Sequence, residues 1–367
     1  MSDAVTDHDR ASGPHDASSG RGQKREDDAE RLSRTTDGDP LSDVLDTIRL
    51  RGALFFTWEP GWHYATDVPA GDRLADVILC GADRILSYHI VTEGPCWGAV
   101  PGQAPVRLET GDILLLPHGD AYCIASQPHR AADTDDPEAF EFFRLMTAGE
   151  LPAVIVDGGD GPGRNRLICG FLACERLPFN PLLDTLPRLL RLPAGGDADD
   201  PLGHLTAFAL SESRRGRDGE RCLLMRLSEA MFVEVLRRYM RTASVDGTGW
   251  LAGLRDPLVG RALGLLHRRP AEPWTLAGLA GELATSRSTL ADHFAALVGV
   301  PPMQYLLRWR MQLAARRLSD RPDKVYTVAR DVGYESEAAF SRAFKRWVGV
   351  SPRAWRDGHR GTSGSGN

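Results

Sequence analysis

The chain has 367 residues, of which 42% are hydrophobic, and a formal net charge of −6 at pH 7. Its length allows two domains of ordinary size, and its apolar content excludes a wholly disordered protein. No apolar run reaches the ~18 residues of a membrane-spanning helix, and the polar N-terminus does not resemble a secretory signal. We expect a cytoplasmic protein without a membrane partner.

In chain order, the segments differ in their predicted structure. Residues 1–40 are rich in Asp, Ser, Gly and Arg and are predicted to form a disordered tail. Residues 41–155 are predicted to form a β-barrel, because short apolar segments such as 84–91 and 112–117 alternate with Gly and Pro turns. Residues 156–249 are mixed, then helical, and end in a linker over 244–249.

The helical part of this connecting region is a candidate dimerisation element. Apolar residues recur at roughly helical spacing within residues 231–240. Such a face serves either a contact between two copies of the chain or packing within one copy, and the sequence favours neither.

Charge is divided unevenly along the chain. Residues 256–358 hold sixteen basic and ten acidic residues, which gives this segment a charge of +6. The remainder holds 28 basic and 40 acidic residues, which gives it a charge of −12. A basic segment within an acidic chain indicates a nucleic-acid partner for that segment alone.

Two segments of this basic region repeat one pattern. Residues 279–302 and 328–352 align on a shared serine, with an offset of 49 residues before it and 50 from it onward. Each copy predicts a helix, a tight turn and a second helix, and the second copy has one extra residue in its turn. The predicted N-caps are Thr275, Ser286, Thr327 and Ser336. The i, i+4 pairs predicted to be buried are Leu290 with Phe294 and Phe340 with Phe344.

A third helix, predicted over 301–318, joins the two copies. The whole segment resembles the DNA-binding domain of AraC/XylS-type transcription regulators, over about residues 256–357. The matched motifs are Val328-Ala329, Gly333-Tyr334-x-Ser336, Phe340-Ser341-Arg342-x-Phe344-Lys345 and Gly349-Val350-Ser351-Pro352 with Trp355-Arg356. The resemblance implies a domain over 250–357, with helix-turn-helix units at about 275–297 and 327–348, and leaves 358–367 as a flexible tail.

The resemblance also implies two recognition helices that enter successive major grooves about 34 Å apart. It assigns base contacts to the exposed early positions of each helix, which are Arg287, Ser288, Ala291 and Asp292 in the first copy and Glu337, Ala338, Ser341 and Arg342 in the second. An arginine at such a position is suited to bidentate pairing with guanine, and a glutamate accepts from cytosine. Phosphate contacts are predicted at Arg310, Lys324, Lys345 and Arg346. The alternative for each residue is a solvated helix face.

The first recognition helix departs from the family pattern. Ala291 and Asp292 stand where many members carry longer or basic side chains. Because a carboxylate repels phosphate, we expect this helix to contribute less affinity than the second, or to read an unusual site.

The N-terminal region resembles a cupin-type barrel. Residues 111–124 resemble the second cupin motif, and 89–98 a reduced first motif. A barrel of this kind suits a sensor that holds a small organic effector. The candidate lining residues are His89, Trp97 and Tyr122.

A metal-dependent cupin enzyme is the alternative function. Such a site needs about three histidines and a carboxylate around one ion. The sequence offers only His89, Glu93 and His118, and Tyr122 stands where the remaining ligand histidine is expected. We therefore predict no metal, no cofactor and no enzymatic activity, with barrel-lining histidines as the simpler interpretation.

The six cysteines are scattered and form no CxxC motif. This pattern argues against a zinc finger and against a secreted disulfide framework. Cys96 and Cys123 lie near the barrel motifs and are candidate redox sensors, although a buried inert thiol is the commoner state.

These features predict an α+β protein of two domains, a cupin-like β-barrel followed by helices and an all-α double helix-turn-helix. The predicted function is that of a bacterial, sequence-specific transcription regulator whose DNA binding responds to a small molecule or to thiol oxidation. Double-stranded operator DNA and an effector are the expected partners, with RNA polymerase and a second copy of the chain as further candidates, in the cytoplasm at the nucleoid. A non-specific DNA-coating protein is disfavoured because a charge of +6 is modest.

Overall fold

The computed structural model describes residues 39–48, 50–61, 63–79, 82–129, 136–157, 165–175, 178–195, 199–242 and 248–360. Of the tails predicted at 1–40 and 358–367, residues 1–38 and 361–367 lie outside these residues, as does most of the linker predicted at 244–249. The tail predictions were wrong at their inner ends, because residue 40 begins a helix and residues 358–360 end one. Among the described helices, none is both long enough and apolar enough to cross a membrane.

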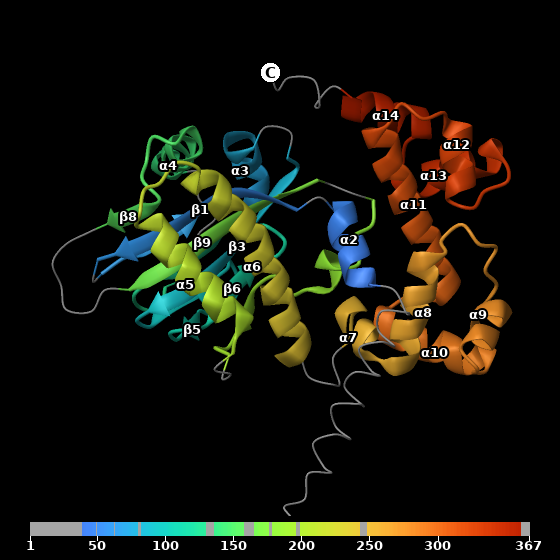
Figure 1. Cartoon of the computed structure of the whole chain (residues 1–367), viewed down its shortest axis with the longest axis horizontal. Coiled ribbons are helices and arrows are strands. Elements are labelled where there is room, and N and C mark those ends of the chain that lie inside the picture. Colours follow the sequence, from blue (N-terminus) through green and yellow to red (C-terminus); the bar gives the residue numbers. More distant parts are fainter. Residues whose placement is uncertain are drawn as a thin grey trace, which may run out of the picture. The chain divides into compact units, whose positions relative to one another are not determined.

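The described strands of the N-terminal region form two sheets (Figure 1). The larger sheet has the order β10 (Leu190–Leu192), β6 (Ile113–Leu116), β3 (Arg84–Glu93), β9 (Arg166–Cys174), β1 (Arg51–Pro60) and β8 (Val154–Asp157). The smaller sheet has the order β2 (Ala65–Val68), β7 (Tyr122–Ala125), β4 (Cys96–Ala99) and β5 (Val106–Leu108). Every neighbouring pair is antiparallel except β1 and β8.

Both strands predicted from the sequence are present, as β3 and β6. Strand β3 is buried on both faces, and its alternate residues belong to two different apolar clusters. Leu86 and Tyr88 pack in the same cluster as the helix α6 (Glu220–Thr242), whereas Ile85 and Val91 pack in the cluster between the sheets. This two-sided burial follows from the period of two residues along a strand.

Three helices interrupt the region that was predicted as strands alone, and the prediction was wrong at these places. They are α2 (Pro40–Ile48), α3 (Gly71–Ile78) and α4 (Pro137–Ala148). At the start of α4, the Asp136 carboxylate accepts a hydrogen bond from the backbone N–H of Glu138 (3.0 Å), and Pro137 occupies the first helical position. Aspartate followed by proline is a helix-start signal that the strand interpretation overlooked.

Strands β9 and β10 lie within the stretch that the sequence analysis assigned to the connecting region, and β9 is central in the larger sheet. The short helix η1 (Leu183–Thr185), α5 (Pro201–Ser213) and α6 complete this stretch. Helix α6 packs on β1 and β9, and Tyr88 donates from its hydroxyl to the Ser228 carbonyl (3.1 Å). On α6, the side chains of Met231, Phe232, Val235 and Leu236 are buried within this chain. The apolar face of the candidate dimerisation segment therefore packs intramolecularly.

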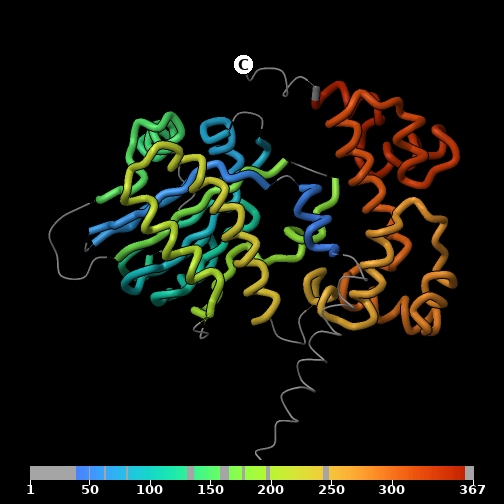
Figure 2. The backbone as a smooth tube through the Cα atoms, viewed as in Figure 1, coloured from blue at the N-terminus to red at the C-terminus, as the bar shows by residue number. Residues whose placement is uncertain are grey.

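The C-terminal region is all-α, as predicted. Its helices are α7 (Trp250–Arg255), α8 (Pro257–Arg268), α9 (Leu276–Glu282), α10 (Arg287–Val298), α11 (Pro302–Asp320), α12 (Val325–Asp331), α13 (Glu337–Val348) and α14 (Pro352–Arg360). Helix α11 runs between the pair α9 and α10 and the pair α12 and α13, and it contacts α10, α12 and α13 (Figure 2). The helix predicted at 301–318 is this connecting helix.

Candidate DNA-binding surface and effector cavity

Each helical pair in the C-terminal region has a serine cap on its second helix. Ser286 Oγ accepts a hydrogen bond from the backbone N–H of Thr289 (3.0 Å) at the start of α10. Ser336 Oγ accepts from the backbone N–H of Ala339 (3.4 Å) at the start of α13. These caps satisfy an N–H group that the helix itself leaves unpaired.

The first helices of the two pairs begin differently. Thr275 caps α9 as predicted, with Oγ1 accepting from the backbone N–H of Gly278 (3.0 Å). The predicted cap Thr327 is wrong, because α12 begins at Val325 and Lys324 occupies the cap position without a side-chain hydrogen bond. The threonine therefore lies inside the helix, and its equivalence to Thr275 does not hold in structure.

The two turns each have a left-handed residue at the equivalent position but differ in length. Ala284 has a φ of 53° and is followed by one residue before the Ser286 cap. Gly333 has a φ of 85° and is followed by two residues before the Ser336 cap. The extra residue predicted for the second turn is therefore Tyr334 or Glu335, beyond the left-handed position.

The residues predicted to be buried in the recognition helices are all buried. Leu290, Phe294, Phe340 and Phe344 each have 0% exposure. Phe294 meets the Tyr305 ring on α11 with 5.8 Å between ring centroids. Burial of this face fixes the rotation of each helix about its axis, and so decides which residues lie on its outer surface.

The predicted base-contact residues lie on that outer surface. Six are exposed, namely Arg287, Ser288, Asp292, Glu337, Ala338 and Arg342, while Ala291 and Ser341 are half-buried. Each helix starts at the first residue of its set, so the reading positions occupy the N-terminal half. That is the part of a recognition helix that contacts base edges in a major groove.

The outer surfaces of α10 and α13 differ in charge. Helix α10 has one arginine and one aspartate, so its formal charge is zero with His293 neutral. Helix α13 has one glutamate against one lysine and two arginines, so its formal charge is +2. Helix α13 is therefore the better partner for the phosphate backbone.

Three of the four predicted phosphate contacts, Lys324, Lys345 and Arg346, are exposed. Arg310 is half-buried, and its guanidinium donates to the carbonyls of Pro270 and Glu272 (2.6 Å each). Burial lowers the pKa of Arg310. The Arg310 side chain stabilises the loop between α8 and α9. Because its guanidinium is engaged there, the predicted contact with phosphate is disfavoured.

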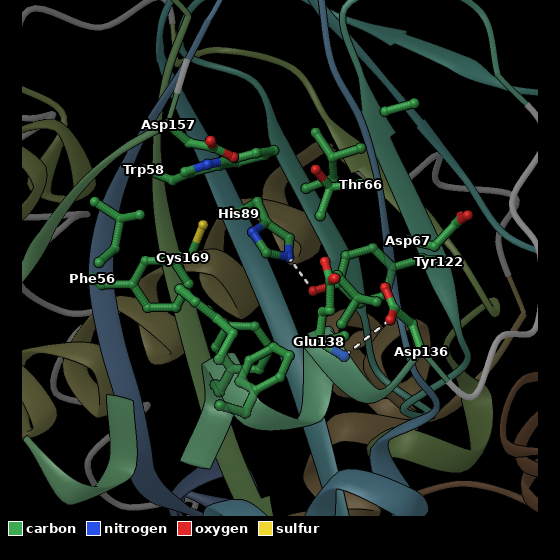
Figure 3. Close-up of a pocket in the computed structure, with 18 of the residues that line it drawn as sticks. Phe56, Trp58, Thr66, Asp67, His89, Tyr122, Asp136, Glu138, Asp157 and Cys169 are labelled. Carbon is green, nitrogen blue, oxygen red and sulfur yellow. Dashed lines mark hydrogen bonds between the residues drawn. The ribbon is translucent and has the colours of Figure 1, made fainter. Parts of the chain in front are cut away.

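The N-terminal region encloses a second candidate site, a cavity of about 910 Å³ between the two sheets (Figure 3). His89 from β3 and Tyr122 from β7 line it, and His89 Nε2 lies 2.7 Å from the Tyr122 hydroxyl. Trp97, the third predicted lining residue, lies on β4 and is not among the residues that line this cavity.

His89 is a neutral group inside this cavity. It is 2% exposed, and burial lowers its pKa to about 3. Its Nδ1 atom is buried and has no hydrogen-bond partner among the described residues. A buried polar atom of this kind is costly unless something binds it.

The cavity wall also contains aromatic residues that the sequence analysis missed, among them Phe56, Trp58, Phe142, Phe143 and Phe171. Phe56 and Phe171 stack with 5.9 Å between ring centroids, and Phe143 meets Phe171 edge-to-face at 5.1 Å. The nearly continuous apolar runs around Phe56 and Phe171 were the available signal. Such runs do not reveal which of two buried faces borders a cavity.

The weak metal candidates His89, Glu93 and His118 do not come together. Glu93 is exposed and pairs with Arg166 (2.9 Å), while His118 Nε2 lies 2.8 Å from the Leu186 carbonyl. Within the described ranges, the one group of three His, Cys, Asp or Glu with ligand atoms within 4.8 Å of one another is Asp67, Cys123 and His129. This group differs from the cupin ligand set.

The two candidate redox cysteines are buried free thiols. Burial raises the pKa of Cys96 and of Cys123 to about 12. Because the thiolate is the reactive form, a raised pKa disfavours rapid oxidation of either residue.

Comparison with known proteins identifies the two regions of the chain. A family model described as a cupin matches residues 39–241, which is more than half of the chain, and a helix-turn-helix domain model matches residues 279–358. A relative in Streptomyces lividans, named an AraC-like transcription regulator, is 35% identical over 325 residues that cover 87% of this chain and 98% of the relative.

A more distant relative also matches most of the chain, and a solved structure matches its C-terminal region. The HTH-type transcriptional regulator AlkR of Acinetobacter baylyi is 28% identical over 325 residues, which cover 87% of this chain and 99% of that protein. Among solved structures, the DNA-binding domain of AdpA in complex with a target DNA is 31% identical. It covers 30% of this chain and 99% of that structure, with a TM-score of 0.29.

Proposed function

Because the chain belongs to the family of AraC-like transcription regulators, we propose that its two helix-turn-helix units bind one operator, with α10 and α13 in successive major grooves. Base contacts come from the outer positions of each helix, and phosphate contacts from Lys324, Lys345 and Arg346. The protein acts in the cytoplasm, at the nucleoid, without catalysis. RNA polymerase is a further partner once the operator is bound.

One observation carries this proposal. Two recognition helices are held through matched buried pairs and matched serine caps, while their N-terminal halves remain exposed. Two helices that present mostly exposed residues at equivalent positions suit two successive major grooves of one duplex.

The affinity for DNA is divided unequally between the two units. Helix α13 adds a charge of +2, whereas the Asp292 carboxylate on the face of α10 repels phosphate and reads only a donor such as cytosine N4. The second unit therefore supplies most of the phosphate attraction. The first unit adds sequence discrimination.

The N-terminal cavity binds a small organic effector whose occupancy changes the affinity of the chain for its operator. His89 and Tyr122 supply polar groups in an otherwise aromatic wall, which is the usual composition of a ligand pocket. Allosteric control of this kind requires a measured coupling free energy between the two sites. A second copy of the chain would bring a second pair of recognition helices.

The direct test is fluorescence anisotropy with the full-length chain and labelled duplexes that flank its own gene. A scrambled duplex of equal length is the control, across a series of salt concentrations. We expect the specific duplex to bind ~10³-fold or more tightly, with a salt slope that corresponds to a handful of phosphate contacts. Equal, salt-labile binding to every flanking and scrambled duplex would contradict the proposal.

A further inference from the structure

The cavity between the two sheets differs in character from its inner end to its mouth. Its inner wall is aromatic and buried, with Phe56, Trp58 and Phe171 all at most 8% exposed. Its mouth is acidic. The four carboxylates that line it are Asp67, Asp136, Glu138 and Asp157.

The cavity lining that the structure describes includes no lysine and no arginine. Its one histidine, His89, is neutral because burial lowers its pKa to about 3. An anionic ligand would therefore meet several negative groups and no counter-charge. The potential of such a mouth favours a cation.

The N-terminus of α4 at the mouth does not reverse this preference. A helix N-terminus attracts anions through its unpaired N–H groups and its dipole. Here the Asp136 carboxylate already accepts from the backbone N–H of Glu138 (3.0 Å), and Glu138 places a second carboxylate in the first turn. The chain itself thus supplies the anions that this helix end favours.

We propose that the cavity binds a lipophilic organic cation, with its apolar body among the aromatic rings and its positive charge toward Glu138 and Asp157. This inference rests on the proposed effector function and names the ligand class. Aromatic faces attract a cation as well as an apolar group, so both halves of such a ligand find a partner. The unpartnered Nδ1 of His89 offers the buried end of the ligand one hydrogen bond.

The arrangement in Figure 3 supports this orientation. His89, Trp58 and Phe56 surround the interior, while Asp157 approaches it from β8, and Asp136 and Glu138 from the start of α4. Glu138 and Asp157 are exposed. A ligand that brings its charge to them need not remove these carboxylates from water, which avoids the large cost of burying an ion.

The test uses two ions of nearly equal shape and opposite charge, tetraphenylphosphonium and tetraphenylborate, with neutral triphenylphosphine oxide as a third probe. Isothermal titration calorimetry with the full chain measures each affinity in sodium buffer. We expect the cation to bind at least ~10-fold more tightly than the anion at low salt. The ratio should fall as salt increases, because the carboxylates at the mouth are exposed and screened.

The double variant E138Q/D157N separates charge recognition from apolar fit. It should weaken tetraphenylphosphonium binding by about 5-fold to 10-fold, because each exposed charge contributes modestly to the affinity. The ratio of the affinity for the cation to that for the anion should therefore decrease. The matched control is Glu141→Gln. Glu141 is exposed on the same helix α4 but pairs with Arg144 and does not line the cavity. This control should leave both affinities unchanged.

Two results would overturn the inference. One is that tetraphenylborate binds the wild-type chain as tightly as tetraphenylphosphonium does. The other is that the ratio of these two affinities is the same in E138Q/D157N as in the wild-type chain. Operator binding, measured separately by anisotropy, tells this failure apart from failure of the proposed function. Specific DNA binding with no preference for cations would support the proposed regulator and contradict the proposed ligand class. Preference for cations without specific DNA binding would support the ligand class and contradict the proposed regulator.

Discussion

The two helix-turn-helix units have similar interiors and different surfaces. Both bury an i, i+4 pair at 0% exposure, both start the recognition helix with a serine cap, and both end it with a left-handed glycine, at Gly299 and Gly349. Their outer faces share little, since α10 is neutral and α13 has a charge of +2.

This difference shows which part of the repeat is fixed by folding. Caps and buried pairs hold each recognition helix in place, so they must be present in both copies. Outer residues contribute little to stability, so they can differ between the copies according to the DNA sequence that each copy contacts. Stability effects should therefore match between the copies, whereas DNA-binding effects should not.

The largest expected effect tests the matched interiors. Phe294→Ala and Phe344→Ala should each lower the free energy of unfolding by about 3–5 kcal/mol, because each removes a ring from a fully buried position. Urea denaturation of the full chain measures both. Val350→Ala is the control, since Val350 is 42% exposed and should cost less than about 0.5 kcal/mol. A loss below about 1 kcal/mol at only one phenylalanine would break the equivalence.

The turns should respond in opposite directions. Gly333→Ala should destabilise by about 2–4 kcal/mol, because φ is 85° and an added Cβ would lie 2.5 Å from the Ala271 carbonyl oxygen. Ala284→Gly should be neutral or stabilising by up to about 1 kcal/mol, because it relieves an alanine held at a φ of 53°. Thermal unfolding of both variants measures the difference, and changes of the same sign would contradict it.

The smallest stability effect comes from the serine caps. Ser286→Ala should cost about 1 kcal/mol, and Ser336→Ala somewhat less, because its hydrogen bond is longer at 3.4 Å against 3.0 Å. Hydrogen exchange at the backbone N–H groups of Thr289 and Ala339 reports each cap locally. No change in exchange at either amide would show that the caps are dispensable.

The repeat made the C-terminal domain predictable from sequence. Two aligned copies give two estimates of each buried pair, and a serine before an apolar run marks a helix start whatever surrounds it. The failure at Thr327 has a simple cause. Thr327 lies 52 residues after Thr275, whereas the repeat offset before the serine is 49, so Lys324 is the position equivalent to Thr275. Lys324 is indeed the cap position of α12, and Thr327 lies in the first turn of that helix. The prediction followed the residue type rather than the offset of the repeat.

The N-terminal cavity was less predictable. His89 and Tyr122 were found because they lie in the two cupin-like motifs, whereas Phe56, Trp58 and Phe171 look the same as core residues in a sequence. Their role depends on how two sheets face each other, and local periodicity does not contain that information. The acidic mouth combines residues from β2, β8 and α4, which are up to 90 positions apart in the chain.

The most direct test of the account compares Arg342→Ala with Arg287→Ala on the operator and on a scrambled duplex, by anisotropy at fixed salt. We predict that Arg342→Ala loses about 1–3 kcal/mol of binding free energy on the operator and much less on the scrambled duplex, and that Arg287→Ala loses less than Arg342→Ala on the operator. Lys345→Ala is the phosphate control, and should weaken both duplexes alike while reducing the salt slope by about 1. Equal losses for Arg342→Ala on both duplexes, or a larger operator loss for Arg287→Ala, would contradict the account.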